Sequence, residues 1–225
     1  MKVVIVAESG FLKDLCLNQS TDSRYLYEQI DNHLITGAIP EYAFAETDGG
    51  LQQQYRKQRI RLQETANLAN ELSRSQNLQP LTAQLKQLVA ELQEQIDNGY
   101  ALVKTELEEI RSQCLTILTN FEIFHRARLR ALSATPPPDE IDCQIFETVL
   151  SFLHEHQQDK ELFLEGKGFE RENPRLSLHY DIRLFLTHDR KDFDYPEIHR
   201  EINALGAIMV FSSSECLRIL RERLP

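Results

Sequence analysis

Several features that mark other classes of protein are missing from this sequence of 225 residues. No apolar run approaches the length that spans a bilayer, and only Lys2 precedes the first apolar run, unlike a secretory signal. Cysteines are few and form no Cys-x-x-Cys pair, which argues against a zinc site and favours reduced thiols. These absences predict a cytoplasmic protein with no membrane partner. The four scattered cysteines are Cys16, Cys114, Cys143 and Cys216.

An excess of basic residues is also missing. Lysine and arginine together number 25, aspartate and glutamate 35, and the net charge is −10. Such a charge argues against nonspecific coating of nucleic acid, which relies on a basic surface. A nucleic-acid enzyme is not excluded, because a carboxylate cluster that holds a metal is itself acidic, and local charge matters more than the total.

Short apolar runs alternate with segments of helical spacing, and together they predict an α/β fold. An apolar fraction of 41% and a charged fraction of 27% are typical of a globular protein with one buried core. Alternation of strand and helix predicts a parallel sheet with helices on both faces. Ser212-x-x-Glu215 predicts a capped start of the last helix. The predicted strands cover residues 3–7, 34–39, 184–186 and 207–211.

A long helical segment interrupts this α/β pattern. Apolar residues recur every three or four positions, which predicts helices from Leu51 to about Ser75 and from Leu81 to about Arg130, separated at Pro80. The repeat is not a strict heptad, so it favours a hairpin that packs on itself and projects from the core over an intermolecular coiled coil. The predicted domains are therefore a first core part at 1–48, a helical insertion at 49–132 and a second core part at 133–225. The polar stretch 157–180 is predicted to be a lid or a locally disordered segment.

Acidic residues follow the ends of the predicted strands. Glu8 comes directly after the first strand, Glu46 soon after the second, and Asp189 and Asp192 after the strand at 184–186, while Asp142 opens a helix. Taken singly, each has an ordinary explanation as a surface, capping or turn residue. Carboxyl ends of parallel strands share one sheet edge, where crowded carboxylates repel one another unless a cation neutralises them. Their coincidence therefore predicts a site for a hard divalent ion with oxygen ligands.

The order and context of these acids resemble the PIN-domain family, a metal-dependent nuclease fold that includes toxin ribonucleases and RNA-processing enzymes. The resemblance covers residues 1–48 and about 133–215. The first motif departs from the family pattern, with Glu8 in place of Asp and Gly10 in place of Asn. The matching stretches are Ala43-Phe-Ala-Glu46, Asp142-Cys-Gln-Ile145 with Asp139 as a fallback, and Thr187-His-Asp-Arg-Lys-Asp-Phe193.

The resemblance implies a divalent-metal-dependent endoribonuclease that cleaves single-stranded RNA by means of a metal-activated water. Mg²⁺ or Mn²⁺ is the implied cofactor, and Asp192 assists the metal site. No catalytic role is expected for His188, an expected exposed loop residue. The resemblance also admits an antitoxin or other protein partner, and a homodimer. The implied catalytic residues and metal ligands are Glu8, Glu46, Asp142 and Asp189.

Basic residues near the two ends of the helical segment are candidates for RNA contacts. A simple antiparallel hairpin brings its start and its end together, so both groups are predicted to flank the acidic site and to bind a phosphodiester backbone. Ordinary solvated helix faces with ion pairs between successive turns are the alternative. The candidates are Arg56, Lys57, Arg59, Arg126, Arg128 and Arg130.

Two other functions remain open at this point. One is a PIN-like pseudo-nuclease, with weak or no catalysis, that serves as an RNA-binding or protein-interaction module; Glu8 and Gly10 favour it. The other is a doubly wound nucleotide-binding or receiver-like domain with a helical dimerisation arm. No glycine-rich phosphate loop follows the first strand, and Glu8-Ser9 fits poorly with the acidic pair of a receiver.

Overall fold

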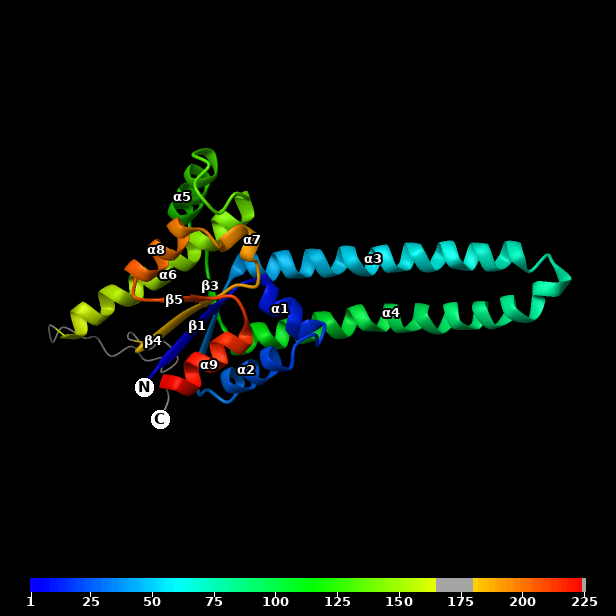
Figure 1. Ribbon diagram of the computed structural model, residues 1–225, viewed down its shortest axis with the longest axis horizontal. Helices are drawn as coiled ribbons and strands as arrows, with labels where there is room; N and C mark the ends of the chain where they lie inside the picture. Colours follow the sequence, from blue (N-terminus) through cyan, green and yellow to red (C-terminus); the bar gives the residue numbers. More distant parts are fainter. Residues whose placement is uncertain (165–179, 224–225) are drawn as a thin grey trace. The chain divides into compact units, whose positions relative to one another are not determined.

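The computed structural model describes residues 1–164 and 180–223, which fall into two compact units. The first unit combines Met1–Thr47 with the described part of Glu109–Pro225, and the second is Asp48–Glu108. Figure 1 shows strands and surrounding helices in the first unit and two long helices in the second. Within the described ranges, no helix combines the length and the apolar character needed to cross a membrane.

A parallel sheet forms the centre of the first unit, as predicted. Its described strands run in the order β3-β2-β1-β4-β5, all parallel. All residues of β1 are buried, because helices cover both faces of this central strand. The chain leaves β1 towards β2 and β3 on one side and reaches β4 and β5 on the other, so the topological switch point lies between β1 and β4. The strands are β1 (Val3–Ala7), β2 (Thr36–Pro40), β3 (Leu115–Ile117), β4 (Ile182–Leu186) and β5 (Ile208–Val210).

Helices cover the two faces of this sheet. One group packs together through a buried hydrogen bond of 2.8 Å between the hydroxyls of Ser23 and Ser213. The other group reaches the sheet through Phe146, whose ring lies 6.4 Å from that of Phe185. Figure 1 shows α2 and α9 on one side of the strands and α6 and α8 on the other. The helices are α1 (Ser9–Cys16), α2 (Thr21–Asp31), α5 (Phe121–Leu132), α6 (Glu140–Leu164), α7 (Arg190–Phe193), α8 (Pro196–Ala204) and α9 (Ser213–Arg223).

The second unit is a helical hairpin formed by parts of α3 (Glu41–Leu72) and α4 (Gln79–Gln113), joined through the short helix η1 (Gln76–Leu78). The helices run antiparallel, with Arg59 bound to Asp97 at 2.7 Å and the ring of Tyr55 at 5.5 Å from that of Tyr100. The predicted break beside Pro80 and the predicted continuity through Gly99 are confirmed. Gly99 lies against Tyr55, since a Cβ there would approach the Tyr55 hydroxyl to 3.2 Å.

The predicted helix from Leu81 to Arg130 is wrong beyond Gln113. The chain instead forms β3, which pairs with β2 through Ala38 and Leu115. A new helix, α5, then begins after Asn120, whose side chain accepts a hydrogen bond of 2.9 Å from the Ile123 N–H. Apolar residues recur every three or four positions on both sides of this strand and across it. The pattern therefore could not distinguish one continuous helix from two helices separated by a short strand.

Other element boundaries differ from the prediction. Helix α3 starts at Glu41, before the predicted start at Leu51, and continues through Gly49 and Gly50. The second strand, predicted at 34–39, runs from Thr36 to Pro40. Helix α6 extends to Leu164, so the first part of the stretch predicted to be a lid or disordered is helical. The rest of that stretch, 165–179, lies outside the described residues.

Candidate functional site

Carboxylates gather at the carboxyl edge of the sheet, beside the switch point between β1 and β4. They line a depression of about 510 Å³, together with Pro138, Ile141 and Lys191. Strands β1 and β4 pair up to Ala7 and Leu186, so Glu8 and the loop after β4 start at the same level of this edge. The carboxylates of the described residues that line the depression are Glu46, Asp139, Asp142, Asp189 and Asp192.

The loop after β4 is held by its own polar side chains. The buried Thr187 hydroxyl accepts a hydrogen bond of 3.1 Å from the Asp189 N–H. The Asp189 carboxylate in turn caps α7, accepting a hydrogen bond of 3.1 Å from the Asp192 N–H. Phe193 then anchors the loop in the core, with its ring 6.2 Å from that of Phe146. The Thr-x-Asp-x-x-Asp-Phe motif therefore encodes a rigid turn that presents two carboxylates.

Burial and crowded negative charge raise the pKa values of two carboxylates in this depression. The pKa of Asp142, in the first turn of α6, rises from 3.8 to about 7. Burial is the largest cause, followed by repulsion from Asp139, Asp192, Glu46 and Asp189. Burial, and next the charge of Asp189, also raise the pKa of Asp192. A site in which carboxylates repel each other in this way favours the binding of a proton or a cation.

Replacing Asp142 by Asn is expected to stabilise the metal-free protein above pH 7 by about 1–2 kcal/mol, a value reduced for solvent screening. The unfolded chain loses the Asp142 proton near pH 4, whereas the folded protein keeps it until about pH 7. The cost of Asp142 to stability therefore grows from pH 4 to pH 7 and is constant above. Urea unfolding of both proteins in EDTA between pH 4 and pH 8 measures this difference, and a difference independent of pH would contradict the assignment.

A lysine that the sequence did not single out adds positive charge beside this site. The Lys13 Nζ lies 2.8 Å from Glu46 Oε1 and 3.3 Å from Ser9 Oγ. Lys13 comes from α1 and Glu46 from α3, so nothing in their sequence spacing predicts this contact. The ion pair partly neutralises Glu46 and ties its carboxylate to the helix that follows β1.

Glu8 is not among the described residues that line the depression. Its side chain is only 5% exposed and turns back towards the loop after β4. Glu8 Oε1 accepts a hydrogen bond of 3.0 Å from the His188 N–H, and Oε2 accepts one of 2.9 Å from the Ser9 hydroxyl. His188 itself is partly buried, contrary to the expectation of an exposed residue, with Nδ1 3.4 Å from Asp14 Oδ2. Glu8 thus joins the ends of β1 and β4.

Glu8 and Gly10, both just after the end of β1, are physically coupled. A Cβ at position 10 would lie 2.5 Å from Glu8 Oε1 and 2.9 Å from the His188 Cβ. The longer side chain of Glu8 therefore occupies space that a side chain at position 10 would need. Gly10 therefore leaves room for both the Glu8 carboxylate and the His188 Cβ.

Gly10→Ala is therefore expected to destabilise the protein by about 1–3 kcal/mol through overpacking. In a Glu8→Asp background the same change is expected to cost about 1 kcal/mol less, since the shorter carboxylate withdraws from position 10 while the contact with the His188 Cβ remains. Denaturant unfolding of the two single variants and the double variant measures this coupling. Additive costs would show that Glu8 and Gly10 are independent.

The donor chemistry of the depression fits Mg²⁺ or Mn²⁺, which prefer carboxylate oxygens. In residues 1–164 and 180–223, however, no three His, Cys, Asp or Glu side chains are grouped so that they could hold a metal ion. The structure therefore brings four predicted ligands to one depression without forming a coordination shell. The ligand roles of Glu46, Asp142, Asp189 and Asp192, and that of Glu8, stay predictions.

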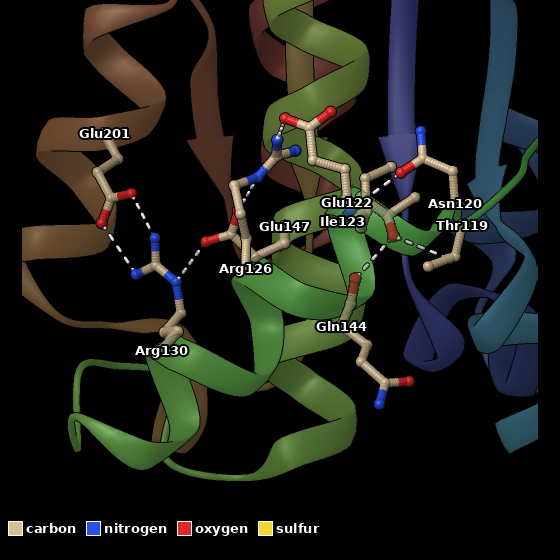
Figure 2. A network of polar contacts seen from close by, with 10 residues as sticks. Thr119, Asn120, Glu122, Ile123, Arg126, Arg130, Gln144, Glu147 and Glu201 are labelled. Carbon is tan, nitrogen blue, oxygen red and sulfur yellow. Dashed lines mark hydrogen bonds and ion pairs between the residues drawn. The ribbon is translucent and has the colours of Figure 1, made fainter.

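The basic residues proposed for RNA binding have different surroundings. Figure 2 shows Arg126 and Arg130 directed towards Glu147, with Arg130 also bound to Glu201. Both guanidinium groups are thus engaged within the first unit, whereas the Arg128 side chain is exposed. In the second unit, Lys57 is exposed. Arg56 and Arg59 line a separate depression of about 510 Å³ together with Tyr55, Tyr100, Gly49, Gln52 and Gln53.

Comparisons of this chain with protein-family models, with curated proteins and with solved structures found no match. The acidic depression at the carboxyl edge of the sheet is therefore the feature from which a function is inferred.

Proposed function

We propose that this protein is a PIN-like endoribonuclease of the cytoplasm that depends on Mg²⁺ or Mn²⁺ and cleaves single-stranded RNA. One observation carries the proposal: carboxylates from α3, from the start of α6 and from the loop after β4 converge on one open depression. This depression lies at the carboxyl edge of a parallel sheet, where ligands of such sheets bind. Residues before the helical hairpin and residues after it both line this depression. This supports the proposal that the hairpin is an insertion in a PIN-like fold.

Glu46, Asp142 and Asp189 are the proposed metal ligands, with Asp192 and Asp139 beside them. Bound there, the divalent ion supplies charge stabilisation at the phosphate and a nucleophile at neutral pH. Asp142 releases its proton near pH 7, so cation binding displaces a proton that the crowded site otherwise holds. Thr187 holds Asp189 in place by accepting a hydrogen bond from its main-chain N–H.

Glu8 is proposed to be a positioning residue in this site. Its carboxylate binds the His188 N–H, one residue before Asp189, and so fixes where the loop leaves β4. A contact with the metal is not needed for this role. The PIN-like pattern, in which the first acid is a ligand, is replaced by one in which the first acid orients a later ligand.

The Lys13–Glu46 ion pair favours a second function, that of a catalytically inactive RNA-binding or protein-interaction module. The Lys13 ammonium already sits 2.8 Å from one predicted ligand. In such a pseudo-nuclease, an internal cation takes over part of the role of a metal, and Glu8 keeps only its structural hydrogen bonds. RNA is then bound without being cleaved.

Metal binding and cleavage can be measured separately on the purified full chain. Addition of Mn²⁺ at pH 7.5 is expected to raise the Tm by several degrees, because the ion binds only the folded site. Labelled single-stranded RNA is expected to be cut with Mn²⁺ and to remain intact with EDTA. Binding of RNA without metal-stimulated cleavage would support the pseudo-nuclease. A chain that binds neither metal nor RNA would overturn both the nuclease and the RNA-binding module.

A further inference from the structure

The helical hairpin exposes large apolar side chains. Its inner surfaces meet through buried residues such as Ala69 of α3 and Val103 of α4. Leucines elsewhere on the two helices, in contrast, are about half exposed, which is more apolar surface than scattered single residues give. These leucines and their exposed fractions are Leu68 (51%), Leu72 (38%), Leu81 (62%), Leu88 (51%), Leu92 (45%) and Leu102 (70%).

These leucines lie on one face of the hairpin. At 100° per residue, Leu72 and Leu68 lie about 60° and 100° to one side of Ala69. By the same measure Leu88 and Leu102 lie about 60° and 100° to the same rotational side of Val103. Ala69 and Val103 mark the sides of the two helices that face each other. Because α3 and α4 are antiparallel, turning in the same rotational sense from Ala69 and from Val103 leads to the same face of the pair. Around the axis of α4, Leu81 and Leu92 lie between Val103 and Leu88. The six leucines together are called the leucine face.

The two helices of the hairpin carry opposite charge. Residues 48–72 of α3 contain four basic and three acidic side chains, whereas residues 79–108 of α4 contain two basic and five acidic ones. The charge of a partner that covers the leucine face is therefore complementary when the partner places an acidic helix over α3 and a basic helix over α4. A second copy of this hairpin provides both helices and an equivalent leucine face.

We propose that two copies of this chain associate through their leucine faces into a symmetric dimer, in which the hairpins form a four-helix bundle. The apolar residues gather towards η1, with Leu68, Leu72, Leu81 and Leu88 on either side of it. Burying them together requires the η1 ends of the two copies to coincide. A two-fold axis parallel to the helices brings the two η1 ends together and sets α3 of one copy over α4 of the other. A two-fold axis perpendicular to the helices would instead set basic α3 over α3 and place the two η1 ends, with their leucines, at opposite ends of the bundle.

A matched pair of variants tests the leucine face. Leu88 and Ile60 lie on the same hairpin with exposed fractions of 51% and 50%, but Ile60 lies about 180° from Ala69, on the outer side of α3. Leu88→Lys is expected to weaken dimerisation at least about a hundredfold, because symmetry buries the charge twice. Ile60→Lys is expected to leave the dimer unchanged. Sedimentation velocity of the full chain from 1 to 100 µM, with circular dichroism to verify helix content, measures both.

A wild-type chain that stays monomeric across this range would overturn the proposal, and so would equal effects of the two substitutions. Ser75→Cys tests the arrangement, because Ser75 is exposed beside η1 while the native cysteines are buried. A short bismaleimide is expected to link two copies through this position. A dimer that is not linked would overturn the arrangement with the η1 ends together. These measurements need neither metal nor RNA, so their outcome is independent of the proposed nuclease activity.

Discussion

Asp189→Asn is expected to lower Mn²⁺-dependent cleavage of single-stranded RNA at least about a hundredfold while the protein stays folded. The Asn side chain keeps a carbonyl oxygen that can accept the hydrogen bond from the Asp192 N–H, so the turn that begins α7 is retained. What is lost is the negative charge at the position from which the proposed ion is held. Cleavage is measured with end-labelled RNA across a titration of Mn²⁺.

His188→Ala is the control for this effect. Its imidazole is not among the described groups that line the depression, and its main-chain N–H, which binds Glu8, is unchanged by the substitution. Cleavage is therefore expected to stay close to that of the wild type. Cleavage that survives both EDTA and Asp189→Asn would remove the carboxylates from any catalytic role.

Arg130→Ala is expected to lower the free energy of unfolding by about 3 kcal/mol or more, the cost of removing one partner of a buried ion pair. The Arg130 and Glu147 side chains are only 10% and 8% exposed, and their Nε and Oε1 atoms are 2.7 Å apart. Arg130 also binds both carboxylate oxygens of Glu201 and the carbonyl of Pro136 (Figure 2 shows the carboxylate contacts). Its loss therefore removes polar contacts that tie α5 to α6 and α8. Guanidinium chloride unfolding measures the change.

Two neighbouring arginines provide graded controls. Arg128→Ala changes an exposed side chain of the same helix and is expected to alter stability by less than about 0.5 kcal/mol. Arg126→Ala removes a 39% exposed partner of Glu147 and is expected to cost about 1 kcal/mol. Equal costs for all three substitutions would show that burial of the Arg130 pair contributes nothing specific. Arg126 and Arg130, two of the predicted RNA-binding residues, are instead engaged in ion pairs within the first unit.

Local sequence patterns were sufficient where a single element decides the outcome. The run Val3–Ala7 is short and apolar throughout, which is typical of a strand buried on both faces, and β1 is such a strand. The predicted cap at Ser212 forms, with its hydroxyl accepting a hydrogen bond of 3.2 Å from the Glu215 N–H. Glu215 reaches back to the Phe211 N–H at 3.0 Å. Both features depend on neighbours in the chain, so the sequence contains the information directly.

The convergence of Glu46, Asp142 and Asp189 could be anticipated for a general reason. Parallel strands all end at the same edge, so acids that follow a strand or open a helix at that edge meet in space even when they are far apart in the chain. The place of Glu8 could not be anticipated in this way. The direction of its side chain depends on the His188 N–H and on the space above Gly10, which the fold brings together.

The sequence by itself determined the class of the fold, the helical hairpin and the sheet edge at which acidic residues accumulate, because these follow from periodicity and chain order. The tertiary structure alone decided that Leu115–Ile117 is a strand, since its hydrogen bonds are made to β2 and not to its own neighbours. It also decided that Lys13 pairs with Glu46 and that Arg130 joins three helices. Contacts between residues far apart in the chain depend on packing, and no spacing within the sequence records them.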